Sequence, residues 1–294
     1  MPATELAWLS VGDRVSQQSI FRLLCECGLA LQFADCLLCN SCSDIEQTAC
    51  ELSPQIKTIG PLFASSSLRQ SKGNFWQEDR ECLGWLDRQP PNSVIYVAFG
   101  SFTTFEKRQF QELALGLELC NHSFLWVVRP DLIDGSSSSS AAADYFPDGF
   151  RARVGDRGRI VGWSPQQKVL AHPSIACFVS HCGWNSTMDG VSNGVPFLCW
   201  PYFGDQKLNL TYICHVWKAG LALEKDGDGI VSRTEISGKI QALVGDVGIK
   251  ARSAELKGIV RESVGEGGSS FKNFNGFVEA MKTPSSRNPN HELK

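Results

Sequence analysis

The stretch that decides the fold is SIACFVSHCGWNSTMDGVSNGVPFLCW, residues 174–200. Residues 174–180 are an apolar run typical of a buried strand, and residues 196–200 form a second such run. Residues 184–193, between them, are predicted to be helical. A strand, a helix and a strand in succession predict a parallel pair, with the turn HCGWNS (181–186) at the carboxyl end of the first strand.

The same alternation continues on both sides of this stretch. Strands are predicted at 93–101, 124–130, 159–163 and 221–225, and helices at 106–120, 165–172, 205–220 and 232–245. Gly220 is the expected stop of the helix over 205–220, and Ser232 is the expected N-cap of the helix over 232–245. The alternation predicts an α/β fold with a doubly wound parallel sheet, in which ligands bind beyond the carboxyl ends of the strands.

The remaining segments set the predicted domain boundaries. The sheet domain is expected over 93–265, preceded by a polar linker with one short helix over 63–92. Residues 1–62 are too short for a second α/β domain and are expected to hold a strand near 33–41 and another element, ending in a turn, over 56–62. A Ser/Ala-rich loop over 131–149, a C-terminal helix over 266–283 and a disordered tail over 284–294 complete the prediction.

Composition excludes several classes of protein. The chain has 294 residues, is 43% hydrophobic and carries a net charge of −3, which gives no electrostatic basis for binding nucleic acid or an anionic membrane. No apolar run reaches the roughly 18 residues of a membrane span, and no secretory leader is visible. The 12 cysteines are scattered, so we expect reduced thiols in a cytoplasmic protein.

The turn 181–186 has the residues of an anion site. A helix that begins near Trp184 directs free backbone N–H groups and its positive dipole end at whatever lies above the strand. Gly183 permits close approach of a ligand, and Ser186 and His181 are hydrogen-bond donors. Asp189 could accept bonds from ribose hydroxyls. These residues alone fit a structural turn equally well.

Two further pairs follow predicted strands. Trp163 offers a flat face for stacking on a base, and Gln166 could hydrogen-bond to the edge of a uracil. Asp205 and Gln206 together could bind the vicinal hydroxyls of a sugar. A core tryptophan and a plain helix cap are the alternatives that these residues also allow.

Other motifs point to different chemistry. CLLCNSC (36–42) has the spacing of an iron–sulfur or zinc site, with Cys25, Cys27 or Cys50 as a fourth ligand. Asp226 and Asp228 have the D-x-D pattern of metal-dependent glycosyltransferases, although acidic residues are routine in such a Gly-rich turn. No dinucleotide fingerprint or P-loop motif is present, which excludes the generic NAD- or ATP-dependent reading of this sheet.

The joint arrangement of these motifs is more specific than any one of them. The 44 residues from Trp163 to Gln206 open with W-x-P-Q, contain HCGWNS and GVP, and close with D-Q. This stretch resembles the signature box of plant UDP-sugar-dependent glycosyltransferases that act on small molecules, and the 83A-type most closely. Residues 94–105, 124–130 and 145–150 resemble the same domain, and 34–41 with 59–62 resemble the end of the family's N-terminal domain and the start of its linker.

The resemblance implies a GT-B-type C-terminal domain with a role for each motif residue. Trp163 would stack on uracil, Gln166 would contact the nucleoside and Asp189 would hold the ribose. The diphosphate would lie on His181, on Gly183, Asn185 and Ser186 of the turn, and on Ser101, while Trp184, Asp205 and Gln206 would shape the sugar pocket. The implied donor is UDP-glucose, with no metal and no cofactor. Asp189 departs from the glutamate usual in the family, which we expect to weaken the ribose contact by roughly 1 kcal/mol.

The resemblance also implies a residue that is absent here. The family deprotonates the acceptor hydroxyl with a histidine near the N-terminus of the full-length chain. The histidines here are His122, His172, His181, His215 and His291, so no catalytic residue is assigned and most of the acceptor domain is expected to be missing. Two readings follow: an inverting transferase that glycosylates a small hydroxylated acceptor as a monomer, or a donor-domain remnant that binds the UDP-sugar without transfer.

Overall fold

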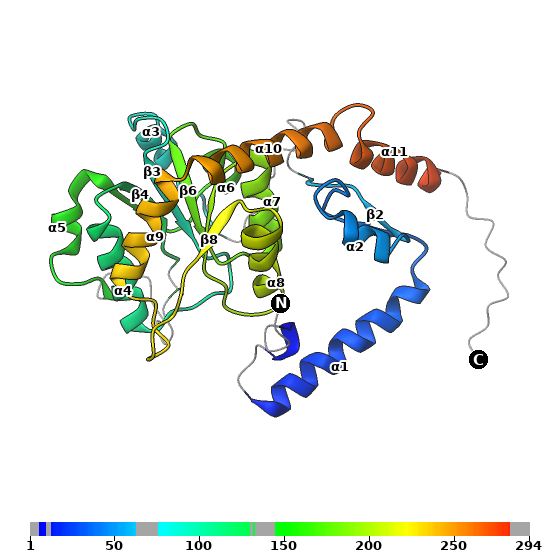
Figure 1. Cartoon of the computed structure of the whole chain (residues 1–294), viewed down its shortest axis with the longest axis horizontal. Helices are drawn as coiled ribbons and strands as arrows, with labels where there is room; N and C mark the ends of the chain where they lie inside the picture. Colours follow the sequence, from blue (N-terminus) through cyan, green and yellow to red (C-terminus); the bar gives the residue numbers. More distant parts are fainter. Residues whose placement is uncertain (1–5, 10–12, 63–75, 130–131, 133–144, 283–294) are drawn as a thin grey trace.

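A six-stranded parallel sheet organises the structure, a computed structural model that describes residues 6–9, 13–62, 76–129, 132 and 145–282. Its strand order is β5-β4-β3-β6-β7-β8 (Figure 1). The strands are β3 (Val94–Ala98), β4 (Ser123–Val127), β5 (Gly158–Val161), β6 (Ile175–Ser180), β7 (Phe197–Cys199) and β8 (Gly220–Ala222). The chain proceeds outward from β3 to one edge and then from β6 to the other, which confirms the doubly wound prediction.

The two central strands create the point at which the chain reverses direction across the sheet. β3 pairs with β6 in parallel, with Ala98 opposite Ser180 at their carboxyl ends. The turns that follow these two strands therefore lie side by side. In doubly wound sheets this switch point is where ligands bind.

Helices cover both faces because residues along each strand alternate between two hydrophobic clusters. On β3, Ile95 and Val97 join the cluster under α4 (Lys107–Leu119) and α9 (Arg233–Gly245). Tyr96 on the opposite face joins the cluster under the other helices. These are α3 (Glu81–Leu86), α6 (Gln166–Leu170), α7 (Trp184–Asn193) and α10 (Val247–Val264). The short α5 (Phe150–Val154) and η6 (Gly155–Arg157) precede β5.

One predicted helix is shorter than expected. The helix over 205–220 is α8 (Gln206–Thr211), followed by a π-helical turn, η7 (Tyr212–Val216). Lys218, with a φ of 55°, follows Trp217 at the end of the helix. The prediction that Gly220 stops the helix is therefore wrong. Gly220 lies in β8, where a Cβ would collide with the carbonyl of Phe197, so glycine lets β8 approach β7.

The segment expected to be a linker is partly core. The predicted short helix is α3, and its Cys82, Trp85 and Leu86 are buried among the residues under β3. The indole of Trp85 donates a hydrogen bond to the carbonyl of Asp156, 3.2 Å away. Residues 76–92 thus pack as part of the sheet domain. Residues 63–75 of the predicted linker, residues 131 and 133–144 of the predicted loop, and the predicted tail lie outside the described residues.

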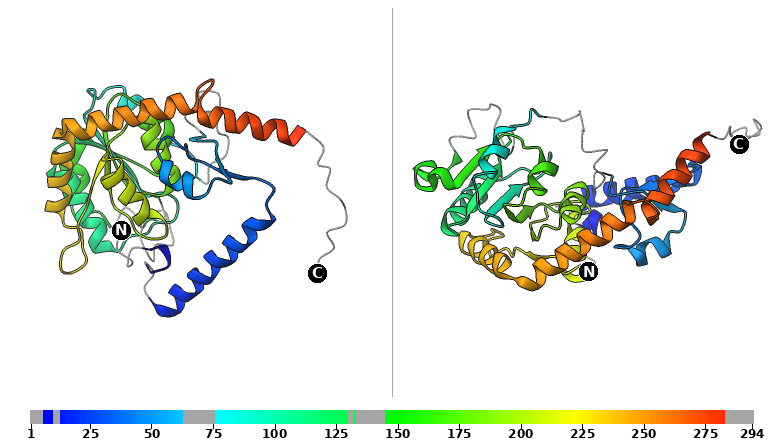
Figure 2. Two further views of the ribbon diagram at one scale, coloured as in Figure 1. Left: turned by 45° about the vertical axis from the view of Figure 1, so that its right-hand side comes forward. Right: turned by 90° about the horizontal axis from the view of Figure 1, so that it is seen from above.

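The front segment, residues 13–62, has its own small sheet. β1 (Leu37–Cys39) pairs in parallel with β2 (Ile56–Thr58), joined through α2 (Gln47–Leu52). Ahead of them η2 (Ala7–Leu9), α1 (Arg14–Ala30) and η3 (Leu31–Phe33) form an arm that extends beside the main body (Figures 1 and 2). α1 was not predicted from the sequence. None of its residues is buried, and large apolar side chains such as Phe21, Leu23 and Leu29 are exposed on it.

The C-terminal helix bridges the front segment and the body. α11 (Ser269–Lys282) continues from α10 in the predicted place (Figure 2). The Ser270 hydroxyl donates to the Gly60 carbonyl at 2.7 Å, and the Asn273 amide donates to the Thr58 carbonyl at 2.9 Å. No helix in the described part of the chain is long and apolar enough to cross a bilayer.

Candidate functional site

The imidazole of His181 lies between two backbone turns at the switch point. Gly100, which follows β3, has a φ of 66°, and a Cβ there would lie 2.5 Å from His181 Nε2. A Cβ on Gly183 would also collide with this nitrogen. Two glycines therefore leave room for the ring, and Ser101 follows directly after the first of them. Cys182, between the ring and the second glycine, has a φ of 63°, which is rare for a residue with a side chain.

The N-terminus of α7 is open to a ligand. Its N-cap is Gly183, which has no side chain to accept a bond from the first-turn N–H groups. By contrast, Ser232 at α9 and Asp246 at α10 accept bonds from their helices at 3.2 Å and 2.9 Å. Uncapped N–H groups and the helix dipole favour an anion at this position.

The electrostatics of His181 fit a neutral donor to that anion. Burial lowers the pKa of the imidazole to about 4, with Asp205 acting in the opposite direction and Arg129 in the same direction. Its Nδ1 atom is buried and has no hydrogen-bond partner among the described residues. A buried ring nitrogen without a partner is costly unless a ligand or a water completes it.

Gln166, Ser186 and Asp189 form a connected group on α6 and α7. The Gln166 amide donates to Ser186 Oγ at 3.1 Å and to Asp189 Oδ2 at 2.9 Å. Burial raises the pKa of the Asp189 carboxyl to about 6, although the bonds from Gln166 and Gln167 favour its ionised form. Asp189 also lines a pocket between α7 and the front segment, together with Asn40, Leu62 and Gln167. The carboxylate is thus held in place and accessible to a ligand.

The predicted sugar-binding pair is placed by α8. Asp205 lies at the start of α8 and accepts a hydrogen bond from the Asn209 amide at 2.7 Å. Asn209 also donates to the Cys182 carbonyl at 2.9 Å, which fixes α8 to the turn 181–186. The buried Gln206 accepts bonds from the backbone N–H groups of Tyr202 and Phe203. Both residues therefore stabilise the turn after β7 beside His181.

Trp184 and Asn185 contact the front segment. The Trp184 indole donates to the Asn40 carbonyl at 2.9 Å, and the Asn40 amide donates to Asn185 Oδ1 at 3.2 Å. The ring of Trp184 also packs against the ring of Trp217, with their centroids 6.3 Å apart. Their predicted roles, at the sugar and the diphosphate, stay predictions; the contacts that the structure gives them join the two parts of the molecule.

Trp163 lies at the same rim but farther along the sheet. It follows β5, the edge strand, and is half-buried against the cluster that contains Tyr96. Its carbonyl accepts a bond from the Asp79 N–H at 2.8 Å, and two residues later Pro165 leads into α6. The ring is therefore carried close to Gln166 by a short, anchored turn.

Sequence reasoning missed Arg129. This guanidinium is 1% exposed, and it donates to the carbonyls of Gly100 and, at 2.9 Å, Thr103. It therefore holds the turn that carries Ser101 against the sheet. The available signal was a charged residue directly after the apolar run FLWVV, since a buried charge needs fixed partners.

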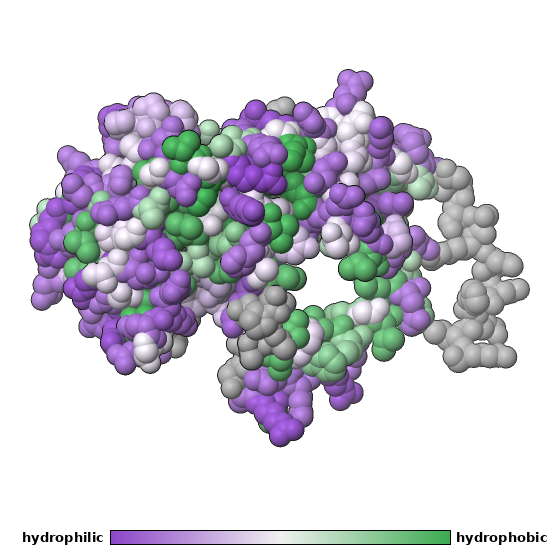
Figure 3. Space-filling view, in the orientation of Figure 1, coloured by the Kyte–Doolittle hydropathy of each residue, from purple (hydrophilic) through white to green (hydrophobic). Residues whose placement is uncertain are grey.

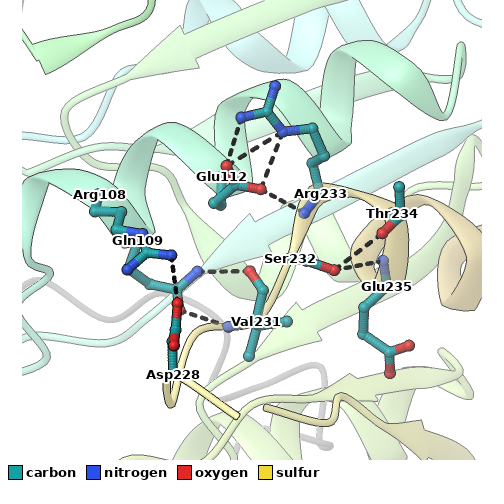
Figure 4. Close-up of polar contacts among 9 residues, drawn as sticks. All are labelled: Arg108, Gln109, Glu112, Asp228, Val231, Ser232, Arg233, Thr234 and Glu235. Atoms are coloured by element: carbon teal, nitrogen blue, oxygen red, sulfur yellow. Dashed lines mark hydrogen bonds and ion pairs between the residues drawn. The ribbon is translucent and has the colours of Figure 1, made fainter. Parts of the chain in front are cut away.

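The D-x-D motif has structural contacts. Asp228 pairs with Arg108 of α4 at 3.0 Å (Figure 4). Asp226 accepts bonds from the N–H groups of Asp228 and Ile230. The same view shows the Arg233 guanidinium, at the start of α9, donating hydrogen bonds to the Glu112 carboxylate. Within the described ranges, no group of three or more His, Cys, Asp or Glu side chains is arranged to hold a metal, the 36–42 cysteines included.

Comparison with known proteins identifies the family. Residues 76–251 match the family model described as UDP-glucoronosyl and UDP-glucosyl transferase. The chain belongs to this family. UDP-glycosyltransferase 83A1 from Arabidopsis thaliana is 43% identical over 96% of this chain, and linamarin synthase 1 from Manihot esculenta is 36% identical over 84%. The chain spans 58% and 52% of the lengths of these two relatives.

Solved structures of family members share the fold. Os79 from O. sativa, solved in complex with UDP, has a TM-score of 0.76 at 33% identity, over 86% of this chain and 57% of its own. UGT2 from Phytolacca americana, solved with UDP-2fluoro-glucose and pterostilbene, has a TM-score of 0.73 at 32% identity, over 85% of this chain and 55% of its own. The predicted GT-B type of α/β fold is confirmed.

Proposed function

We propose that this chain binds a UDP-sugar, UDP-glucose first of all, at the rim of the sheet. The observation that carries the proposal is the turn 181–186, in which an uncapped helix N-terminus and an unpaired, buried imidazole face the switch point. The diphosphate would lie on this turn and on Ser101, the ribose against Asp189, and the uracil on Trp163. The family's UDP complexes support the same class of ligand.

The proposed reaction is inverting transfer of the hexose to a hydroxyl of a small molecule, without a metal. The N–H groups of α7 and His181 would stabilise the charge on the departing diphosphate, which is the part a metal plays in other enzymes. In this reaction the acceptor oxygen attacks the anomeric carbon, the bond to the diphosphate breaks, and a base takes the hydroxyl proton. That the protein is monomeric and cytoplasmic stays a prediction.

No histidine in the described part of the chain is placed to act as this base. His172 bonds to Ser174 and Asp87 at the amino end of β6, the opposite end of the sheet from the site. His122 precedes β4, also at the amino end, and His215 lies on η7. His181 has a pKa near 4 and faces the predicted diphosphate. The second candidate, binding of the UDP-sugar without transfer, therefore has a specific observation in its favour.

Calorimetric titration with UDP-glucose, beside a glucosyl-transfer assay with phenolic and aliphatic alcohols, tests both candidates. Binding with turnover supports transfer, and binding without turnover supports the donor-binding unit. Gly183→Ala, which forces the His181 ring to move, should weaken binding about tenfold. Gly162→Ala is the matched control, since nothing lies within 4 Å of a Cβ there. No binding by the native chain would contradict both candidates.

A further inference from the structure

Two thiols that the donor site does not use lie next to each other below it. Cys199 is the last residue of β7 and is fully buried, and Cys214 is half-buried in η7. Their Sγ atoms are 3.8 Å apart. The residues are only 15 positions apart in the sequence, and the two sulfurs would have to approach by about 1.8 Å to reach the length of a disulfide bond.

The pKa values of the two thiols shift in opposite directions. A hydrogen bond with Cys199 and the positive charge of Lys239 lower the pKa of Cys214 against the opposing effect of its burial, which favours the thiolate form. Burial and the neighbouring thiols raise the pKa of Cys199. Cys39 and Cys50, which are also half-buried, have pKa values raised by burial and by Glu46. Among these thiols Cys214 combines access with activation.

The backbone at Cys214 is also unusual. The π-helical turn places the N–H of Trp217 on the carbonyl of Tyr212 at 2.7 Å, an i to i+5 bond. Such a turn contains one residue more than an α-helical turn and is frequent at functional sites. It brings Cys214 toward β7 while the flanking Tyr212 stays half-exposed. An activated thiol is therefore presented to an internal partner.

We propose that Cys214 is an oxidation site, at which a peroxide oxidises the thiol and Cys199 closes a reversible disulfide. Hydrogen peroxide gives up one oxygen to the Cys214 thiolate, forming sulfenic acid and, after protonation, water. The Cys199 sulfur then attacks the sulfenic sulfur, the S–O bond breaks, and a second water leaves with the Cys199 proton. Two thiols are oxidised and one peroxide is reduced. This proposal does not depend on the proposed function.

A third thiol makes the pairing testable. Cys182 is fully buried in the turn 181–186 and is close enough to Cys199 to share a hydrogen bond with it. A disulfide could therefore form between Cys199 and Cys214 or, less directly, involve Cys182. Trypsin separates Cys214, on peptide 208–218, from Cys177, Cys182 and Cys199, which share peptide 169–207. Fragment ions from the backbone between Cys182 and Cys199 then assign the linked cysteine.

The experiment treats the folded chain with hydrogen peroxide and maps linked peptides by tandem mass spectrometry. Exposed Cys25, Cys27 and Cys36 are first replaced by serine. We expect a link between Cys199 and Cys214, with the loss of two hydrogen atoms and reversal by dithiothreitol. In the untreated protein, Cys214 should react with iodoacetamide about tenfold faster than Cys50.

Matched variants decide the assignment. Cys177→Ser removes a buried thiol from the same tryptic peptide and should leave the link intact. Cys214→Ser, at a half-buried position that tolerates the change, should abolish the link and leave Cys199 reduced. Absence of the link in a protein that circular dichroism shows to be folded would overturn the proposal. So would a link from Cys214 to Cys182, or irreversible oxidation of Cys214 alone.

Discussion

The sheet body and the front segment differ in how deeply their side chains are buried. In the body, Phe110, Phe178 and Trp126 are completely buried, and aromatic rings contact one another on both faces of the sheet. In the front segment, α1 has no buried residue, and Phe33 is 78% exposed. Figure 3 shows hydrophobic side chains along this arm where the body presents mostly polar ones.

The difference shows which part of the molecule organises the candidate site. The elements that carry His181, Asp189, Asp205 and Gln166 all emerge from the packed sheet. The front segment reaches the body through Cys42 and Ile45, which join the cluster on one face of the sheet, and through hydrogen bonds such as that of the Trp217 indole to the Ile45 carbonyl at 2.8 Å. We infer that ligand binding depends on the body, and that the front segment closes one side of the pocket through Asn40.

The largest expected effect compares two phenylalanines. Phe110→Ala should lower the free energy of unfolding by about 3–5 kcal/mol, because it leaves a cavity beside Trp126 and Phe146. Phe33→Ala should change it by less than about 0.5 kcal/mol, because this ring is in contact with solvent. Urea denaturation followed by circular dichroism measures both. Equal losses would show that α1 is packed in solution.

The next effect concerns the cation that sequence reasoning missed. Arg129→Met should cost about 2–3 kcal/mol of stability, because it leaves the carbonyls of Gly100 and Thr103 unpaired. It should also weaken UDP binding, because the turn that carries Ser101 loses its anchor. Arg108→Met is the control, since it removes an exposed guanidinium paired with Asp228. Equal UDP affinity in both variants would argue against the anchor.

Asp189→Asn should make the fold more stable and lower the affinity for the ligand. The folded carboxyl has a pKa of about 6 against an ordinary 3.8, so the native chain loses stability as pH rises through that range. The neutral amide avoids this loss. We expect a gain of about 1–2 kcal/mol at pH 7.5 and no gain below pH 4. Thermal melts at both pH values measure it, and a gain independent of pH would contradict the pKa assignment.

The smallest effect separates docking from ligand binding. Trp217→Phe and Trp184→Phe each remove one indole bond to the front segment, and each should cost about 1 kcal/mol of its local stability. Hydrogen exchange at the Ile59 and Gly60 amides, which bond to β1 and Ser41, should report it for both variants. Only Trp184→Phe should also lower UDP-glucose affinity, if this ring contacts the sugar as predicted.

The sequence predicted the body well because its signals are local. The central strands of the sheet are runs of apolar residues, and the turns at the carboxyl ends of β3, β5, β6 and β7 each contain a glycine or proline. The helix over 184–193 was predicted to the residue. The end of the helix predicted over 205–220 was not, because the helical turns end at Val216, the left-handed Lys218 follows, and Gly220 serves the approach of β8 to β7. A glycine required by a neighbouring strand cannot be told from a helix stop in one sequence.

The candidate site shows the same limit. The rule that the carboxyl ends of parallel strands share one rim placed Gln166 at the same rim as Ser186 and Asp189, and the structure joins the three by hydrogen bonds. It could not show that Trp184 and Asn185 bond to Asn40, which lies 144 and 145 residues away. Nor could it show that Arg129 bonds to the carbonyls of Gly100 and Thr103, because no residue type marks a carbonyl partner. Long-range contacts to the backbone leave little trace in the order of residues.

The most direct test of the diphosphate turn is a paired titration of UDP and uridine into the native chain and His181→Ala. The native chain should bind UDP more tightly than uridine, because only UDP reaches the imidazole and the N-terminus of α7. In His181→Ala we predict that the affinity for UDP falls about tenfold and that the affinity for uridine does not change. Equal losses for both ligands, or no loss for either, would show that the diphosphate does not lie on this turn.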